Sequence, residues 1–308
     1  MRVLIAGAAG FLGKECLRQF KEHDHEVITT DQAAAVDLRG NLADGKFTAS
    51  LPDVDVVVNC AAVQYVTKGV PFFLRRRFFR INNVQSAKHL CERYRNHATH
   101  FVHVGTSMMY LQTGQEQYTI QSQMGGEGVY SRSKIAAQAY VDTLPRAATV
   151  IPCIIGGEGR EGLFSGFVTM MIKLGVVVFP GRGNHKIHMA HVTDVANLIL
   201  RIAETQACGI YNAASSDPLT IRQWIDEIRD ELGIKRAIVL TIPLLPVKWL
   251  SWLFAYRLLA REQLLMLEFT HVLSTDESQA IGWQPKYTNA EIAREIARHI
   301  KNRLVCQS

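Results

Sequence analysis

Tyr130 and Lys134 are the two side chains of this sequence that are best suited to move a proton together. In a helix, a spacing of four residues puts both on the same face, one turn apart. A phenol has a pKa of about 10, and a neighbouring ammonium favours the phenolate, which can take the proton of an alcohol and return it. A hydroxyl from Thr106 or Ser107 would orient the alcohol oxygen. We therefore expect these four residues to form a catalytic group.

The first thirteen residues contain a motif that could bind the cofactor for such a catalytic group. Residues 2–6 are typical of a buried strand, and they lead into a turn with glycine at positions 7, 10 and 13. Glycines allow a tight turn and let a phosphate approach the backbone, and the helix that follows offers N–H donors at its N-terminus. A glycine turn also serves in ordinary strand-to-helix connections. As a dinucleotide cradle, this one would consist of Gly7, Gly10, Phe11, Leu12 and Gly13.

An acidic residue follows the second predicted strand, at residues 26–30. Asp31 stands eighteen residues beyond Gly13, where a carboxylate can accept hydrogen bonds from the adenosine ribose and would repel a ribose phosphate. This position favours NAD over NADP as the cofactor. The alternative is an aspartate that only forms a turn.

The order of the predicted elements indicates the fold class. The apolar strands alternate with helices through residue 157, which predicts an α/β protein with a Rossmann-type, doubly wound parallel sheet. Tyr130 opens a helix that follows the strand ending at Thr106 and Ser107. The predicted strands after the second lie at 36–38, 55–62, 101–104 and 149–155, and the helices between them at 81–95 and 130–144.

The pattern changes after residue 157 to a smaller, mixed and mainly helical C-terminal lobe. We therefore place an NAD-binding domain at residues 1–157, with residues 188–213 returning to it. Residues 158–308 would then form most of a substrate-binding lobe.

Composition and charge exclude several classes of protein. With 308 residues and 48% hydrophobic content, the chain can bury a large core, which excludes a disordered or fibrous protein. Acidic residues are interspersed along the chain despite its net charge of +6, so we expect no nucleic-acid partner. The six cysteines form no C-x-x-C pair, and no signal peptide precedes the first strand, which together predict a cytoplasmic protein. Histidines 185, 188 and 191 would alternate sides in an extended segment, so we expect no metal site.

Two further segments are open to more than one interpretation. Residues 75–80 carry four arginines in six positions, which form a solvated face or contact phosphate or an anionic membrane. Residues 244–256 are strongly apolar, but Pro246 and Lys248 interrupt them well short of the ~20 residues of a membrane span. This segment is core of the small lobe, a wall for an apolar substrate, or an interfacial helix. We expect no transmembrane span and leave peripheral membrane contact open.

Together these motifs resemble those of the extended short-chain dehydrogenase/reductase family, the NAD-dependent epimerase/dehydratase family, along nearly the full chain. The resemblance places the family's serine or threonine at Thr106, with Ser107 beside it. It also implies that Tyr130 and Lys134 contact the cofactor as well as the substrate. Beyond the glycine loop and Asp31, the cofactor site that it implies comprises Asp37, Leu38, Cys60, Ala61, Ala62, Asn82, Pro152 and Ile155.

Departures from the family pattern bear on the substrate. Ile187 occupies the position at which many sugar-nucleotide members carry a diphosphate-binding arginine. Residues 181–184, 244–256 and 282–285 are similar instead to the 3β-hydroxysteroid, or sterol, dehydrogenase-like branch.

The resemblance therefore implies an NAD-dependent oxidoreductase that transfers a hydride between NAD and a secondary alcohol or ketone. The substrate would be steroid-like or lipid-like, with Tyr130 as the acid and base. One alternative is a nucleotide-sugar epimerase or dehydratase with tightly bound NAD, and another is a non-catalytic NAD-binding sensor. The expected partner is a small-molecule substrate, and homodimer formation stays open.

Overall fold

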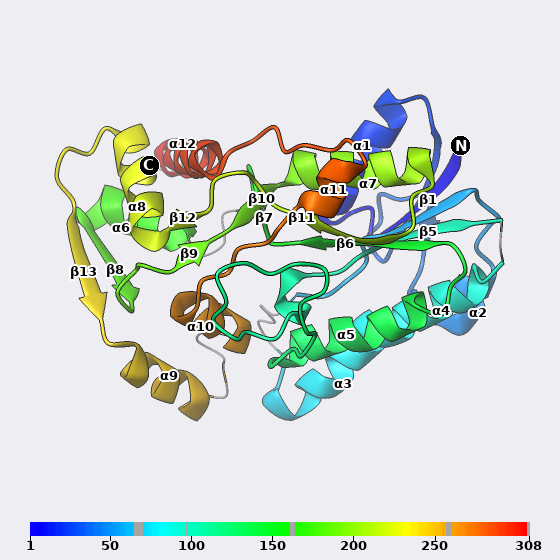
Figure 1. The fold of residues 1–308 in the computed structure, drawn as a ribbon, viewed down its shortest axis with the longest axis horizontal. Coiled ribbons are helices and arrows are strands. Elements are labelled where there is room, and N and C mark those ends of the chain that lie inside the picture. Colours follow the sequence, from blue (N-terminus) through cyan, green and yellow to red (C-terminus); the bar gives the residue numbers. More distant parts are fainter. Residues whose placement is uncertain (65–69, 97, 161–163, 255, 257–259, 307–308) are drawn as a thin grey trace.

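A seven-stranded parallel sheet forms the centre of the fold (Figure 1). The structure, a computed structural model, describes residues 1–308 except 65–69, 97, 161–163, 255, 257–259 and 307–308. The strand order is β11-β6-β5-β4-β1-β2-β3, which confirms the Rossmann-type doubly wound sheet. The strands are β1 (Arg2–Ala6), β2 (Glu26–Asp31), β3 (Leu38–Arg39), β4 (Val56–Asn59), β5 (His100–Val104), β6 (Ala147–Pro152) and β11 (Gly209–Ala213).

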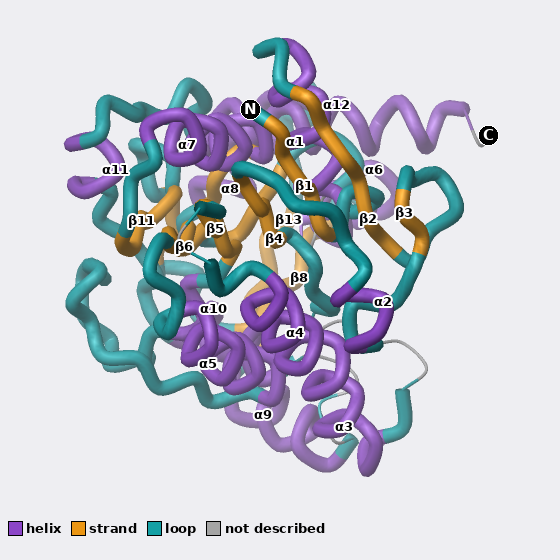
Figure 2. Tube along the Cα trace, turned by 90° about the vertical axis from the view of Figure 1, so that its right-hand side faces the viewer, coloured by secondary structure: helices purple, strands orange, loops and turns teal. Residues whose placement is uncertain are grey.

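Helices cover both faces of this sheet (Figures 1 and 2). α1 (Phe11–Glu22) and α7 (Val192–Thr205) pack against each other on one face. The other face carries α2 (Gly45–Ala49), α4 (Ser86–Arg93) and α5 (Val129–Val141). Both faces of the central strands are therefore buried, as their continuous apolar runs predict.

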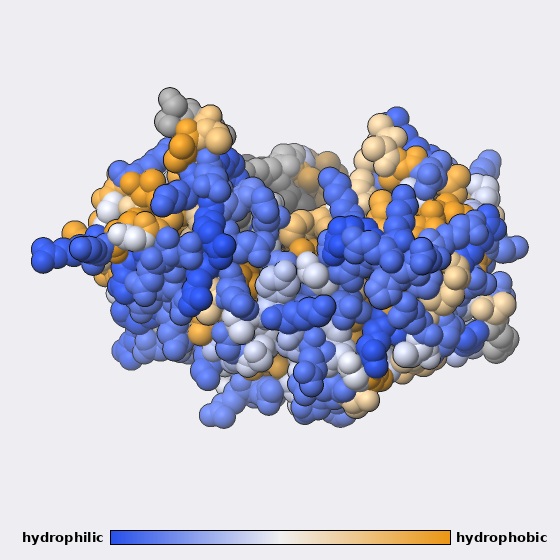
Figure 3. Space-filling model, turned by 90° about the horizontal axis from the view of Figure 1, so that it is seen from above, coloured by the Kyte–Doolittle hydropathy of each residue, from blue (hydrophilic) through white to orange (hydrophobic). Residues whose placement is uncertain are grey.

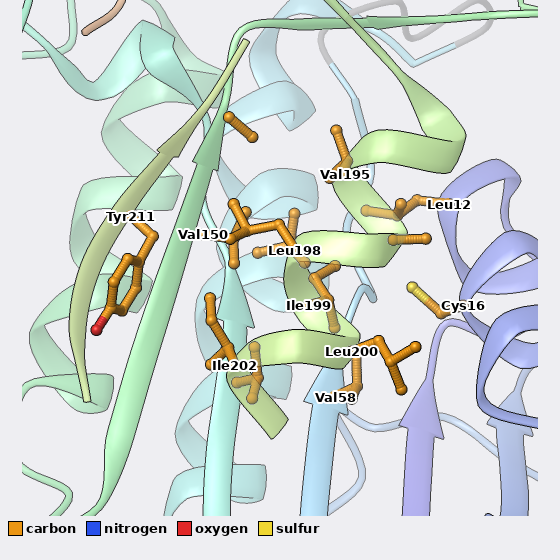
Figure 4. Close-up of a cluster of buried hydrophobic side chains, with 14 of the residues drawn as sticks. Leu12, Cys16, Val58, Val150, Val195, Leu198, Ile199, Leu200, Ile202 and Tyr211 are labelled. Atoms are coloured by element: carbon orange, nitrogen blue, oxygen red, sulfur yellow. The ribbon is translucent and has the colours of Figure 1, made fainter. Parts of the chain in front are cut away.

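The larger core lies between α1, α7 and the sheet, as Figure 4 shows. Along α7, Val195, Leu198, Ile199 and Ile202 recur at helical spacing, and each is fully buried. Burying one such side chain contributes about 2 kcal/mol. α7 and β11 come late in the chain, yet β11 pairs with β6 and so completes the sheet.

The predicted strand at residues 149–155 is divided in two. β6 ends at Pro152, and β7 (Ile154–Gly156) pairs with β10 (Met189–His191) in a separate sheet. Between them the Cys153 N–H donates to the Ala213 carbonyl, 3.0 Å away. Proline supplies no N–H of its own to a ladder, which makes this a natural place for the strand to change partners.

The predicted helix at residues 81–95 begins earlier and changes its winding. Helical structure starts near Phe72 and ends at Arg93, so the arginine-rich residues 75–80 are its first turns. The segment consists of the 3₁₀ turn η1 (Phe72–Leu74), α3 (Arg75–Phe79), the π-helical η2 (Arg80–Gln85) and α4. A π-helical stretch is rare and frequently marks a functional site.

The C-terminal lobe has a core of its own. Phe164 stacks on the buried Trp224 with ring centroids 4.5 Å apart. Thr220 and Gln223 form the capping box that their spacing indicates. The elements of this lobe are α6 (Phe164–Leu174), β8 (Val176–Pro180), β9 (Lys186–Ile187), β12 (Leu219–Thr220), α8 (Ile221–Leu232), β13 (Ile238–Ile242) and α12 (Asn289–Cys306).

Three helices lie between β13 and α12 along the chain, and the last of them contacts β11 of the sheet. They are α9 (Leu244–Leu253), α10 (Arg261–Glu268) and α11 (Asp276–Ala280). The interpretation of residues 244–256 as core is wrong, because Ser251 is the one residue of α9 that is buried. Residue 255 of that segment lies outside the described residues. Among the helices that the structure describes, none has the length and apolar content needed to cross a membrane.

Candidate active site

The glycine loop between β1 and α1 is shaped by close backbone contacts. Gly7 has a positive φ of 79°, and a Cβ there would lie 2.7 Å from the Ala61 Cα. A Cβ at Gly13 would collide with the Gly7 carbonyl oxygen. Side chains are therefore excluded from the place where α1 begins, and a phosphate can reach the helix N-terminus. This cradle fits the pyrophosphate of a dinucleotide.

The predicted cofactor residues line two adjoining cavities at the carboxyl ends of the strands. Gly7, Gly10, Cys60 and Ala62 belong to both linings, so the cavities form one groove. An extended dinucleotide needs a groove of this kind, with the glycine loop under its centre. One cavity continues to Asp31, Ala61 and Asn82, and the other to Phe11, Leu12, Gly13, Thr106, Ser107, Tyr130, Lys134, Pro152 and Ile155.

Asp37 and Leu38 are the two predicted cofactor residues that neither lining includes. The Asp37 carboxylate accepts hydrogen bonds from the Thr29 hydroxyl (2.6 Å) and N–H (2.9 Å), which hold the pKa of this carboxyl below its usual value. Leu38 packs at the margin of the core beneath the sheet. In the structure both residues tie β3 to β2.

Asp31 ends β2 at the far side of the groove from Tyr130. Its carboxylate accepts hydrogen bonds from the backbone N–H groups of Ala9 (3.2 Å) and Gln32 (2.6 Å). The same side chain therefore fastens the glycine loop and faces the cavity in which an adenosine ribose would lie.

This position leads to a prediction about cofactor choice. We expect the protein to bind NAD at least about tenfold more tightly than NADP, because a carboxylate and a ribose phosphate would repel each other at close range. Asp31→Asn keeps an acceptor for the Ala9 N–H but removes the charge. It should therefore reduce the difference between the dissociation constants of NAD and NADP. Calorimetric titration with both cofactors measures it, and Asp24→Asn, at an exposed turn, is the control. Tighter binding of NADP by the unchanged protein would contradict the role of Asp31.

The opposite end of the groove carries Tyr130 and Lys134, the predicted proton-transfer pair. Tyr130 lies in the first turn of α5, and its ring packs edge-on against Phe79 with centroids 6.1 Å apart. One turn later the Lys134 ammonium donates to the Val104 carbonyl at the end of β5, 2.6 Å away. Burial lowers the pKa of Lys134 to about 8. An ammonium carries three donors, so it can keep this bond and still hold a ligand.

The two hydroxyl candidates have different surroundings. Thr106 is half-buried in the lining of the groove, whereas Ser107 is buried and bonds to His271. The Gln112 amide donates to the Tyr110 carbonyl (3.0 Å), which turns its oxygen toward His271 Nδ1 (3.0 Å). Nδ1 therefore carries the imidazole hydrogen, and Nε2 accepts from the Ser107 hydroxyl at 2.6 Å. Burial lowers the pKa of His271 to about 3, so the imidazole between Gln112 and Ser107 is neutral.

Thr106 is thus the hydroxyl that can donate to a substrate oxygen, because the proton of Ser107 is directed to His271. Sequence reasoning did not find His271 or Gln112. His271 lies more than a hundred residues from Tyr130 along the chain, and no motif surrounds it.

The neighbouring residues Asn82 and Asn83 have different surroundings: Asn82 lines the groove, and Asn83 is buried behind it. Asn82 lines the groove near Asp31, and its side chain donates to the Phe78 carbonyl at 2.8 Å. The buried Asn83 accepts from the Val63 N–H (2.8 Å) and donates to the Val63 carbonyl and the Ser133 hydroxyl. Sequence reasoning missed Asn83, which fastens the chain after β4 to the helix that carries Tyr130.

A dinucleotide groove at the carboxyl edge of a doubly wound sheet, with a tyrosine and a lysine at one end, defines a nicotinamide-dependent enzyme of the Rossmann type. Residues 3–214 match the NAD dependent epimerase/dehydratase family, and the chain belongs to this family. The cofactor of this family is NAD, in agreement with the cofactor predicted from the sequence.

Individual proteins are similar to this chain. The spore coat polysaccharide biosynthesis protein SpsK of Bacillus subtilis is 25% identical over 250 residues, which cover 77% of this chain and 82% of SpsK. DesIV of Streptomyces venezuelae, a dTDP-glucose 4,6-dehydratase solved with NAD and TYD, is 22% identical with a TM-score of 0.76, over 99% of this chain and 98% of DesIV. A human epimerase family protein solved with NADPH is 20% identical with a TM-score of 0.77, over 98% of this chain and 100% of that one. The two structural likenesses establish the fold.

Proposed function

We propose that this protein interconverts a secondary alcohol and a ketone with NAD, and that Tyr130 is the acid and base of the reaction. The observation that carries the proposal is one cavity lining that unites the glycine loop with Thr106, Tyr130 and Lys134. When bound, NAD supplies the hydride acceptor, and its reduced form supplies the hydride donor. Cofactor and proton carrier would then meet at one end of the groove.

Each of the three side chains has one task in this proposal. Tyr130 takes the hydroxyl proton of the alcohol in the oxidative direction and returns it to the ketone oxygen in the reverse direction. The Lys134 ammonium favours the phenolate of Tyr130 and holds the cofactor's ribose. The Thr106 hydroxyl donates to the substrate oxygen and stabilises the negative charge that develops on it.

The cofactor residues and the domains follow the same assignment. We assign the pyrophosphate to the glycine loop, the adenosine ribose to Asp31, and the remainder of the dinucleotide to the groove between them. Residues 1–157 with 188–213 would form the NAD-binding domain, and most of residues 158–308 the substrate lobe. The packing of α7 and β11 onto the sheet supports this division.

A second cavity, of about 590 Å³, adjoins Tyr130 from the side of α3 and gives room for the body of a substrate. Three phenylalanines and Val129 supply an apolar wall, which suits a lipid-like or steroid-like carbon skeleton. Its phenylalanines are Phe72, Phe73 and Phe79, its tyrosines are Tyr130 and Tyr256, and its guanidinium groups belong to Arg75, Arg76, Arg132 and Arg261.

Nucleotide-sugar epimerisation or dehydration is the second candidate. The guanidinium groups of this cavity could bind a diphosphate, and phenylalanine rings could stack on a base. The names of SpsK and DesIV, which concern polysaccharide and dTDP-sugar chemistry, also favour it. Against it, Ile187 is buried in the small lobe and offers no cation for a diphosphate.

The two candidates differ in what happens to the cofactor. With NAD and a steroid or long-chain secondary alcohol, the leading proposal expects one NADH and one ketone for each alcohol consumed, followed by absorbance and mass spectrometry. A nucleotide sugar that is converted while no NADH accumulates would establish the second candidate instead. Testing both substrate panels on one preparation distinguishes them.

A further inference from the structure

Large apolar side chains are exposed on α9 and on the residues that precede α3, and these helices lie on the lower side of the molecule in Figures 1 and 2. Both views place α9 and α3 at this side. The cavity beside Tyr130 lies between them, since Phe72 and Phe73 line it together with Tyr256, just after α9. We call this the α9–α3 surface: Leu245, Trp249, Trp252, Leu253 and Phe254 of α9 and its C-terminus, Phe72 and Phe73 of η1, and Arg76, Arg77 and Arg80.

The helix α9 has its apolar stripe on the outside. Leu245, Trp249 and Trp252 recur at helical spacing, and they are 77%, 59% and 63% exposed. Its buried side offers only Ser251, flanked by partly buried residues. A helix in contact with water is expected to show the reverse pattern. Among the residues that the structure describes, none covers this stripe, which therefore calls for a non-aqueous neighbour outside them.

Charge indicates which neighbour this is. Arg76, Arg77 and Arg80 are exposed, and within the described residues no salt bridge joins them to an acid. The two acids of the cavity lining are already engaged: Glu127 pairs with Arg261 at 2.6 Å, and the buried Glu262 accepts from the Ser131 N–H. The surface thus presents guanidinium groups beside exposed aromatic rings.

We propose that the α9–α3 surface docks on an anionic lipid bilayer. Tryptophan prefers the level of the lipid headgroups because its ring is apolar and carries an N–H donor, and phenylalanine and leucine bury at the boundary with the acyl chains. Arginines bind the phosphate of anionic lipids. The opposite side of the molecule, seen in Figure 3, is mainly hydrophilic, which gives the protein the sidedness of a peripheral membrane protein.

A second copy of the chain fits this surface less well. In a two-fold contact the same arginines of both copies would enter one interface without acids to pair with. A bilayer instead supplies many phosphates at once. Docking also turns the cavity beside Tyr130 toward the bilayer, from which an apolar substrate could enter.

Vesicle flotation tests this proposal without any substrate, so its outcome does not depend on the proposed reaction. We expect the protein to float with vesicles of equal parts phosphatidylcholine and phosphatidylserine and much less with phosphatidylcholine alone. Arg76→Glu/Arg77→Glu and Trp249→Ser/Trp252→Ser should each reduce binding by about tenfold or more, because each replaces exposed side chains of the surface. Circular dichroism checks that both variants stay folded.

Matched controls replace exposed residues elsewhere. Lys46→Glu/Lys301→Glu changes the net charge equally on α2 and α12, and Leu174→Ala/Val305→Ala removes exposed apolar groups from α6 and α12. These variants should bind like the unchanged protein. No flotation of the unchanged protein, equal losses in the controls, or a dimer that the surface variants dissociate in the absence of vesicle binding would each overturn the proposal.

Discussion

Tyr130→Phe should lower turnover by about a thousandfold, the range expected when a general acid and base is removed. The variant loses only the phenolic oxygen, and its ring can keep the edge-on contact with Phe79. The cofactor should therefore still bind, and the change should fall on kcat much more than on NAD affinity. Steady-state kinetics on any accepted substrate, together with calorimetric titration of NAD, measure the two effects.

Tyr140→Phe is the matched control for this experiment. It makes the same change on the same helix, α5, at a partly exposed position outside the groove. We expect its activity to equal that of the unchanged protein. Activity retained by Tyr130→Phe would remove the proposed acid and base, and equal losses in both variants would indicate damage to α5.

The parts of the site that sequence reasoning found are those that depend on local spacing. Gly7, Gly10 and Gly13 are needed within a single turn, and Tyr130 and Lys134 face the same way because a helix repeats every 3.6 residues. The spacing of residues that are close in the sequence is enough to predict short-range geometry of this kind. The alternation of strands and helices likewise predicts the doubly wound sheet, which the structure confirms.

The parts of the site that sequence reasoning missed depend on contacts between segments that are distant along the chain. His271 reaches Ser107 across 164 positions of the chain, and Asn83 reaches Ser133 across 50. A buried histidine has no local pattern to distinguish it from any other. Helical periodicity also could not tell which side of α9 faces water, because apolar residues occur on both sides of that helix.

Lys134→Met should separate activity from stability. We expect turnover to fall by about a hundredfold, because the phenolate of Tyr130 loses the neighbouring ammonium that favours it. Folding should be stabilised at the same time. The pKa of Lys134 falls from 10.5 to about 8 on burial, so the folded state disfavours the charged form by about 3 kcal/mol. The variant also loses the hydrogen bond to the Val104 carbonyl, which costs about 1 kcal/mol of stability. The free energy of unfolding should therefore rise by about 2 kcal/mol in total.

The pH dependence of this gain gives the prediction a second, independent measurement. Below pH 8 the lysine is protonated in both the folded and the unfolded state, so the unchanged protein bears the full cost of burying the charge. Between about pH 8 and 10.5 the unfolded state binds more protons than the folded state, and the stability of the unchanged protein rises. The advantage of Lys134→Met should therefore shrink over this window in urea unfolding. Lys21→Met, at an exposed position of α1, should show no such change. A variant that is destabilised at pH 7, or an advantage that grows above pH 8, would mean that the ammonium is stabilised in the fold, contrary to its burial.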